Sequence, residues 1–244
     1  MIHNHFDASA LANAAEPCCQ QHRAEHTSIF MQLHTYFRSS AAYRVRIALE
    51  LKRLDYQSIP VHLLRGGGEQ HAVTFASLNP AELVPVLVDG EVTLTQSLPI
   101  IEYLNEVHPE PALLPCDAAG RARVRALAQT IACEIHPLNN LRVLQYLEKG
   151  LGADLQTRNA WYAHWVGLGF RALERMLVEG ASTGLFCHGD TPTLADCCLV
   201  PQIYNAERFA IPLTAYPTIL RIGRNCRNLD AFQRAAPDIQ VDAG

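Results

Sequence analysis

Two adjacent serines, Ser39 and Ser40, stand where the sequence predicts its first helix to begin. Residues 32–36 alternate polar and apolar side chains, and the run after the serines is rich in helix formers, so the stretch predicts strand, turn and helix. The start of a helix has unpaired N–H groups and a positive dipole end, which favour an anion and above all a thiolate. The serine hydroxyls either donate to such an anion or serve only as an N-cap.

Three arginines lie within the same turn and helix: Arg38, Arg44 and Arg46. Capping a helix does not require cations, because the amino end of the helix dipole is already positive. We therefore expect the three guanidinium groups to surround the helix start and to bind a negatively charged ligand there.

The whole-chain composition narrows the possible functions. Asp and Glu number 24 against 20 Lys and Arg, and no basic block occurs, which argues against nucleic acid as a partner. No apolar run approaches the ~18 residues that span a bilayer. The eight cysteines form no C-x-x-C pair and have no histidine at zinc-finger spacing, which argues against a metal site. These patterns predict a soluble protein of a reducing cytoplasm, with no membrane or metal.

The hydrophobic pattern starts at Met31. Residues 1–30 lack the apolar central segment of a secretory signal, and we expect them to be a disordered leader. Residues 31–112 predict an α/β domain, and residues 117–244 predict an all-helical domain after a short linker.

Within the α/β domain, a second strand is expected at 56–61 and a hairpin at 83–95, with its turn at Asp89-Gly90. A cis bond between Val84 and Pro85 would leave the Val84 backbone free to pair with a ligand. Ser97 is expected to cap the next helix.

The helical domain shows apolar residues at helical spacing, including Trp161 and Trp165, which we expect in the core. Pro137 should kink the first long helix and direct His136, Asn140 and Arg142 to one side. The alternative is that Asn139 and Asn140 only satisfy carbonyls that the kink frees.

Two features near the end of the chain are structural predictions. Thr193 and Asp196 have capping-box spacing. The tail after Pro237 is expected to be loose.

Several motifs in order resemble one known family. The segment 37–49, Phe-Arg-Ser-Ser-x-x-Tyr-Arg-Val-Arg-Ile-Ala-Leu, is similar to the signature of zeta-class glutathione transferases, and the resemblance extends over about residues 31–240 through the segments 78–80, 96–97, 136–141 and 205–209. It implies the glutathione transferase fold: a thioredoxin-like α/β domain followed by an all-α helical bundle. One departure is Ala41, where many members have a cysteine.

The resemblance also implies a site. Ser39, Ser40 and Arg44 would be catalytic, with Ser39 donating to the glutathione thiol. Glutathione would be bound by Ser39, Ser40, Gln70, Val84, Gln96, Ser97, His136, Asn140, Leu141 and Arg142. A small dicarboxylic substrate would be bound by Arg38, Arg44, Arg142 and Arg208. A homodimer is also implied.

The best-known activity of the class is cis–trans isomerisation of maleylacetoacetate to fumarylacetoacetate in tyrosine and homogentisate breakdown, with glutathione as cofactor. A close alternative is maleylpyruvate isomerisation on a gentisate pathway, whose enzymes tend to have an arginine at the position of Leu141. A conjugating transferase or haloacid dehalogenase, and a non-catalytic adaptor, are further alternatives.

Overall fold

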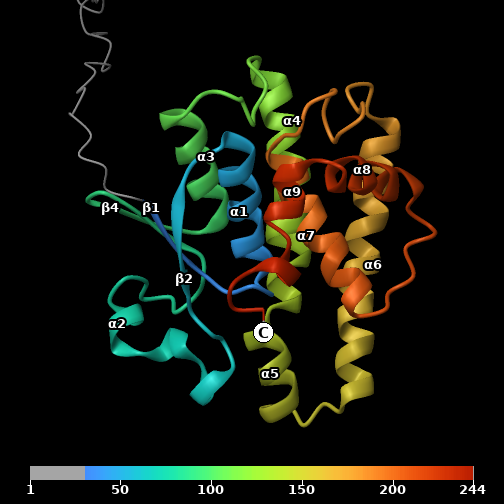
Figure 1. The fold of residues 1–244 in the computed structure, drawn as a ribbon. Helices are drawn as coiled ribbons and strands as arrows, with labels where there is room; N and C mark the ends of the chain where they lie inside the picture. Colours follow the sequence, from blue (N-terminus) through green and yellow to red (C-terminus); the bar gives the residue numbers. More distant parts are fainter. Residues whose placement is uncertain (1–30, 244) are drawn as a thin grey trace, which may run out of the picture.

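A computed structural model describes residues 31–243 (Figure 1). The predicted leader, residues 1–30, lies outside the described residues. The strands are β1 (Met31–Thr35), β2 (Tyr56–Pro60), β3 (Val86–Asp89) and β4 (Val92–Thr95). The helices are α1 (Ser40–Lys52), α2 (Val73–Ala76), α3 (Ser97–Val107), α4 (Ala118–Gln129), α5 (Leu141–Lys149), α6 (Leu155–Glu179), α7 (Leu194–Arg208), α8 (Pro217–Arg227) and α9 (Asp230–Arg234).

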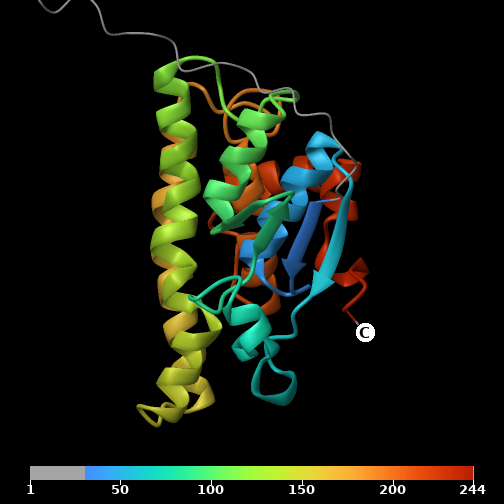
Figure 2. The same cartoon turned by 90° about the vertical axis from the view of Figure 1, so that its left-hand side faces the viewer.

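The four strands form one mixed sheet in the order β2-β1-β3-β4. β1 and β2 are parallel and joined by α1, whereas β3 pairs antiparallel with both β1 and β4. The predicted hairpin is confirmed, with its loop at Gly90 and Glu91, one residue later than expected, because Asp89 still pairs with Val92. Gly90 has a φ of 59°, which favours glycine there. The α/β unit followed by helices confirms the predicted fold class (Figure 2).

The core runs without interruption from the sheet into the helical unit, because α1 packs against α7 as well as α3. α7 is buried along nearly its whole length. The predicted capping box at its start is present: Asp196 is fully buried and accepts from the Thr193 N–H at 2.8 Å. The same carboxylate accepts from the Cys187 N–H at 2.9 Å, so it also fixes the preceding loop.

Three local predictions are wrong. Trp161 and Trp165 are only partly buried, because the inner face of α6 is formed by Tyr162, Val166 and Phe170 instead. Gln96, with a φ of 68°, occupies the cap position of α3, and Ser97 is the first helical residue.

The third correction concerns the C-terminal tail. It is not loose: Pro237 is buried and begins a short 3₁₀ helix, Pro237–Ile239. The Asp242 carboxylate then accepts from the Phe37 N–H at 2.9 Å. The end of the chain therefore packs against the turn that precedes α1, which a sequence pattern does not reveal because the two are 205 residues apart.

No helix among residues 31–243 is long and apolar enough to cross a membrane.

Candidate active site

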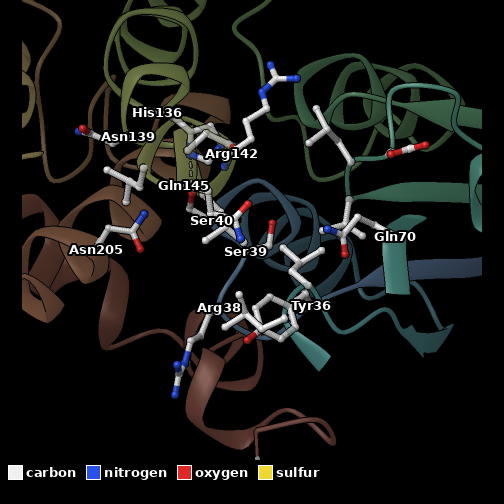
Figure 3. A pocket seen from close by; sticks show the side chains of 18 of the residues that line it. Tyr36, Arg38, Ser39, Ser40, Gln70, His136, Asn139, Arg142, Gln145 and Asn205 are labelled. Carbon is white, nitrogen blue, oxygen red and sulfur yellow. Dashed lines mark hydrogen bonds between the residues drawn. The ribbon is translucent and has the colours of Figure 1, made fainter. Parts of the chain in front are cut away.

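A cavity of about 420 Å³ opens between the α/β unit and the helices, at the amino end of α1 (Figure 3). We call its two sides the N-terminal wall and the helical wall. The N-terminal wall consists of Tyr36, Arg38, Ser39, Ser40, Leu63, Leu64, Gln70, His71, Ala81, Glu82, Leu83 and Val84. The helical wall consists of His136, Asn139, Asn140, Leu141, Arg142, Leu144, Gln145, Tyr162, Asn205, Arg208 and Phe209.

Ser39 is the N-cap of α1, and its Oγ accepts from the Ala42 N–H at 3.2 Å. Because the oxygen is used as an acceptor, the hydroxyl proton stays available to donate into the cavity. The N–H groups of the first two helical residues, Ser40 and Ala41, have no intrahelical partner by helix geometry. The amino end of α1 thus presents hydrogen-bond donors and a positive dipole to the same space.

Ser40 connects the two walls. Its Oγ lies 2.7 Å from His136 Nδ1. Burial, and then the nearby Arg44 and Arg142 charges, lower the pKa of His136 from 6.5 to about 3, so its ring is neutral at physiological pH. A neutral imidazole pairs with the hydroxyl without adding a charge to the cavity.

The predicted interruption at Pro137 is present and positions His136. α4 ends at Gln129 and continues as a π-helical segment, Thr130–Ile135, and a 3₁₀ turn, Pro137–Asn139. A π-segment widens the backbone and re-aims the side chains that follow it.

α6 holds this interruption in place. Trp161 Nε1 donates to the Leu138 carbonyl at 2.8 Å, and Asn139 Nδ2 donates to the Tyr162 carbonyl at 3.4 Å. Asn140 caps α5 by accepting from the Arg142 N–H at 3.2 Å. The two asparagines therefore bond to the Arg142 N–H and to a carbonyl of α6, and not to carbonyls freed by the kink as the structural alternative expected, while both also line the cavity.

The prediction that Arg38, Arg44 and Arg46 all surround the start of α1 is wrong for the last two. Of these three arginines, only Arg38 lines the cavity, and its side chain extends away from the serines (Figure 3). Arg44 is 2 % exposed and donates to Ser97 Oγ at 3.1 Å, so a direct substrate contact does not fit its position. Arg38 lies in the turn before the N-cap, whereas Arg44 lies within α1 and its side chain reaches the start of α3.

Arg46 is fully buried and acts as a clamp on the turn before α1, which it holds by hydrogen bonds. Its guanidinium donates to Thr35 Oγ1 at 3.0 Å and to the Phe37 carbonyl at 3.1 Å, and it also donates to the Ala235 carbonyl at 3.1 Å. Burial lowers the pKa of Arg46 to about 10, which still leaves it charged at neutral pH. The charged guanidinium of Arg46 therefore stabilises the backbone turn that positions Ser39.

The other candidate residues divide between the cavity and its surroundings. Gln70, Val84, Leu141, Arg142 and Arg208 line the cavity as expected. Val84 comes two residues before β3 and takes no part in its ladder.

Gln96 and Ser97 lie at the amino end of α3 and do not line this cavity, so their contact with a ligand stays a prediction.

Some residues that line the cavity were not indicated by the sequence. Asn205 was part of a recognised segment in which only Arg208 stood out, and it faces the cavity from α7 (Figure 3). His71 and Glu82 flank recognised residues but carried no motif of their own. Their proximity arises from the path of the loop, which local patterns do not encode.

Comparison with known proteins agrees with this geometry. Residues 33–112 match the family model for the glutathione S-transferase N-terminal domain. The chain is 54% identical over 211 residues to a probable maleylacetoacetate isomerase of Vibrio cholerae, covering 86% of this chain and 97% of that protein.

Two solved structures are similar over nearly the same length. A holo maleylpyruvate isomerase, described as a bacterial zeta-class glutathione S-transferase, is 49% identical with a TM-score of 0.85, covering 87% of this chain and 100% of that one. A maleylacetoacetate isomerase of Anaeromyxobacter dehalogenans with glutathione in its active site is 45% identical with a TM-score of 0.78, covering 88% and 98%. The chain belongs to the glutathione S-transferase family, and within it to the zeta class.

Proposed function

We propose that this protein is a glutathione-dependent cis–trans isomerase that converts maleylacetoacetate to fumarylacetoacetate. The observation that carries the proposal is the Ser39 hydroxyl, held at the amino end of α1 and opening on a cavity that Arg38, Arg142 and Arg208 also line. A thiolate and an anionic acid both require hydrogen-bond donors and cations, and this cavity offers both.

The N-terminal wall fits glutathione. Gln70 is 8 % exposed, and its Oε1 has no partner among the described residues, so a ligand N–H would satisfy it. Gly68 leaves room for this amide, because a Cβ there would lie 2.5 Å from Gln70 Nε2. Val84, whose backbone is outside the ladder, would pair with the cysteinyl backbone of glutathione. Ser97 at the start of α3 would receive the γ-glutamyl carboxylate.

Bound glutathione supplies a thiolate that adds reversibly to the cis double bond and lets it rotate. Ser39 would donate its hydroxyl proton to the sulfur and so favour the thiolate, whose pKa is otherwise near ~8.5. The free N–H groups and the dipole of α1 act in the same direction. Because Ala41 replaces the cysteine of many relatives, the polypeptide offers no thiol within this motif.

The helical wall would bind the acid. Arg208 and Arg142 are exposed at the cavity surface, where their guanidinium groups would pair with a dicarboxylate. Arg38 supplies a third cation from the N-terminal wall. Asn140 and the neutral His136 add uncharged polar groups near the carbonyl on which charge develops.

Maleylpyruvate is the alternative acid, and the comparisons include relatives named for each activity. Leu141, in the helical wall, favours maleylacetoacetate, because it leaves this position without the arginine that maleylpyruvate isomerases tend to have.

The test is to incubate the purified protein with each acid in turn and catalytic amounts of glutathione. We expect loss of the cis enedione absorbance with maleylacetoacetate, many turnovers per glutathione, and an unchanged free-thiol concentration. Stoichiometric loss of thiol would indicate a conjugating transferase instead, and faster turnover of maleylpyruvate would reassign the substrate.

We also propose that the protein is a cytoplasmic homodimer, as the family resemblance implies. Light scattering coupled to size-exclusion chromatography of the full chain should give twice the chain mass; the mass of a single chain would contradict the dimer.

A further inference from the structure

A chain of three side chains borders the cavity on its N-terminal wall: Glu82, His71 and Gln70. Glu82 Oε2 lies 2.5 Å from His71 Nδ1, and His71 Nε2 lies 3.0 Å from Gln70 Nε2. Neither His71 nor Glu82 belongs to the residues through which the class is recognised.

The chemistry of the groups sets the direction of these hydrogen bonds. An ionised carboxylate only accepts, so Nδ1 of His71 carries the proton and donates to Glu82. In the neutral ring Nε2 then holds the lone pair, and only the NH₂ group of Gln70 can donate to it. The Oε1 atom of Gln70 is left over, and it is the buried oxygen without a partner among the described residues.

The backbone places all three residues where this arrangement is possible. Gly68, with a φ of 113°, allows the close approach of the Gln70 amide. Glu82 has a φ of 54°, a left-handed conformation that is unfavourable for a non-glycine residue. Backbone strain of this kind persists where the surrounding structure requires the side chain in that place.

We propose that His71 and Glu82 are positioning residues that hold the Gln70 amide with its oxygen facing the cavity, where it accepts an N–H group of glutathione. Without His71 the amide is free to rotate, and it presents its NH₂ group to the same ligand N–H for part of the time. The inference rests on the proposed glutathione site, and it concerns affinity for glutathione alone.

A double-mutant cycle tests the proposal with Gln70→Ala, His71→Ala and the combined variant, and with His164→Ala on the exposed face of α6 as the control. Steady-state kinetics give kcat and the KM of each reactant, and calorimetry gives the Kd of glutathione without turnover. Loss of one hydrogen bond is expected to raise the KM and Kd for glutathione about fivefold in each single variant.

The double variant should be no weaker than Gln70→Ala, since His71 acts only through Gln70. The kcat and the KM of the acid should stay unchanged. An unaltered glutathione Kd in His71→Ala, effects that multiply in the double variant, or a fall in kcat would each overturn the proposal. A wild-type protein that neither binds glutathione nor depends on it would instead overturn the proposed function itself.

Discussion

The two walls of the cavity are built in different ways. The turn that carries Ser39 is held from below by the fully buried Arg46 and from outside by Asp242 of the C-terminal tail. In contrast, none of the residues of α5, which carries Leu141 and Arg142, is buried. The Ser39 turn of the N-terminal wall is therefore held by hydrogen bonds on several sides, whereas Leu141 and Arg142 of the helical wall lie on a short helix with no buried residue.

This difference matches the two ligands. A cofactor that is the same in every turnover is best recognised by preorganised backbone and capped helix ends, which lose little entropy on binding. In the proposed site, exposed arginines would form ion pairs with the substrate acid, and substituting them would alter its affinity without disturbing the core. Substitutions of the residues that hold the Ser39 turn or bind glutathione should therefore affect folding, glutathione affinity or the chemical step, and substitutions of Leu141, Arg142 and Arg208 on the helical wall should affect only acid affinity and choice.

The largest effect is expected from Arg46→Met. The variant leaves carbonyls of the turn and of Ala235 buried without donors, which should lower the free energy of unfolding by about 3–5 kcal/mol. Urea unfolding measures this. As a control, Arg234→Met removes an exposed ion pair to Glu50 in the same region and should cost below about 1 kcal/mol. Similar losses in both variants would show that Arg46 is not the clamp.

Ser39→Ala should reduce kcat by about 100-fold, because it removes the proposed hydrogen-bond donor to the glutathione sulfur. It also removes the N-cap, so Ser39→Asp is the matched variant: a carboxylate keeps the cap acceptor but cannot donate and repels a thiolate. We expect Ser39→Asp to be as stable as the parent and inactive. Near-normal turnover in either variant would contradict the assigned role.

The bond between Ser40 and His136 joins the two walls and should make stability sensitive to acid. The folded protein holds the pKa of His136 at about 3, below its ordinary 6.5, so the unfolded chain binds the proton first as the pH falls. The free energy of unfolding should be unaffected above pH 6.5 and should decline below it, by roughly 2 kcal/mol near pH 4 after allowance for partial exposure.

His136→Gln keeps a polar partner for Ser40 but does not titrate. The free energy of unfolding of this variant should vary less with pH over the same interval, whereas that of the exposed His164→Gln variant should follow the parent. Parallel curves for the parent and His136→Gln would rule out this source of acid sensitivity.

Arg208→Gln, on the helical wall, should raise the KM of the acid about tenfold, since a hydrogen bond to a charged group contributes about 1.5 kcal/mol or more. The KM of glutathione and the free energy of unfolding should not change. Arg224→Gln on α8 is exposed and remote from the cavity and serves as the control. A larger change in the KM of glutathione than in the KM of the acid would show that Arg208 binds glutathione and not the acid.

The smallest effect is expected from Leu141→Arg, which should shift the ratio of kcat/KM values towards maleylpyruvate by about threefold, the size of an exposed charge interaction. Tyr146→Arg adds the same charge to α5 outside the cavity and should leave the ratio unchanged. An equal shift in both variants would attribute the change to net charge and not to the position of Leu141.

The sequence by itself determined the order of strands and helices, the start of α1 at the two serines, the hairpin at Gly90 and the capping box at Asp196. These features depend on contacts within a few residues, such as helix caps and turn geometry, which local residue types specify. The segment 37–49, together with the four further segments that follow it in order, was also sufficient to indicate the family.

Only the tertiary structure decided where the charges go. Arg44 and Arg46 share a helix with Ser39, yet they are directed to Ser97 and to the carbonyls of the turn because α1 is packed between the sheet and α7. The pairing of Asp242 with Phe37 and the chain from Glu82 to Gln70 likewise join segments that only folding brings together. Burial gives the contacts of Arg44 and Arg46 their strength, and burial is a property of the packed chain and not of any local pattern.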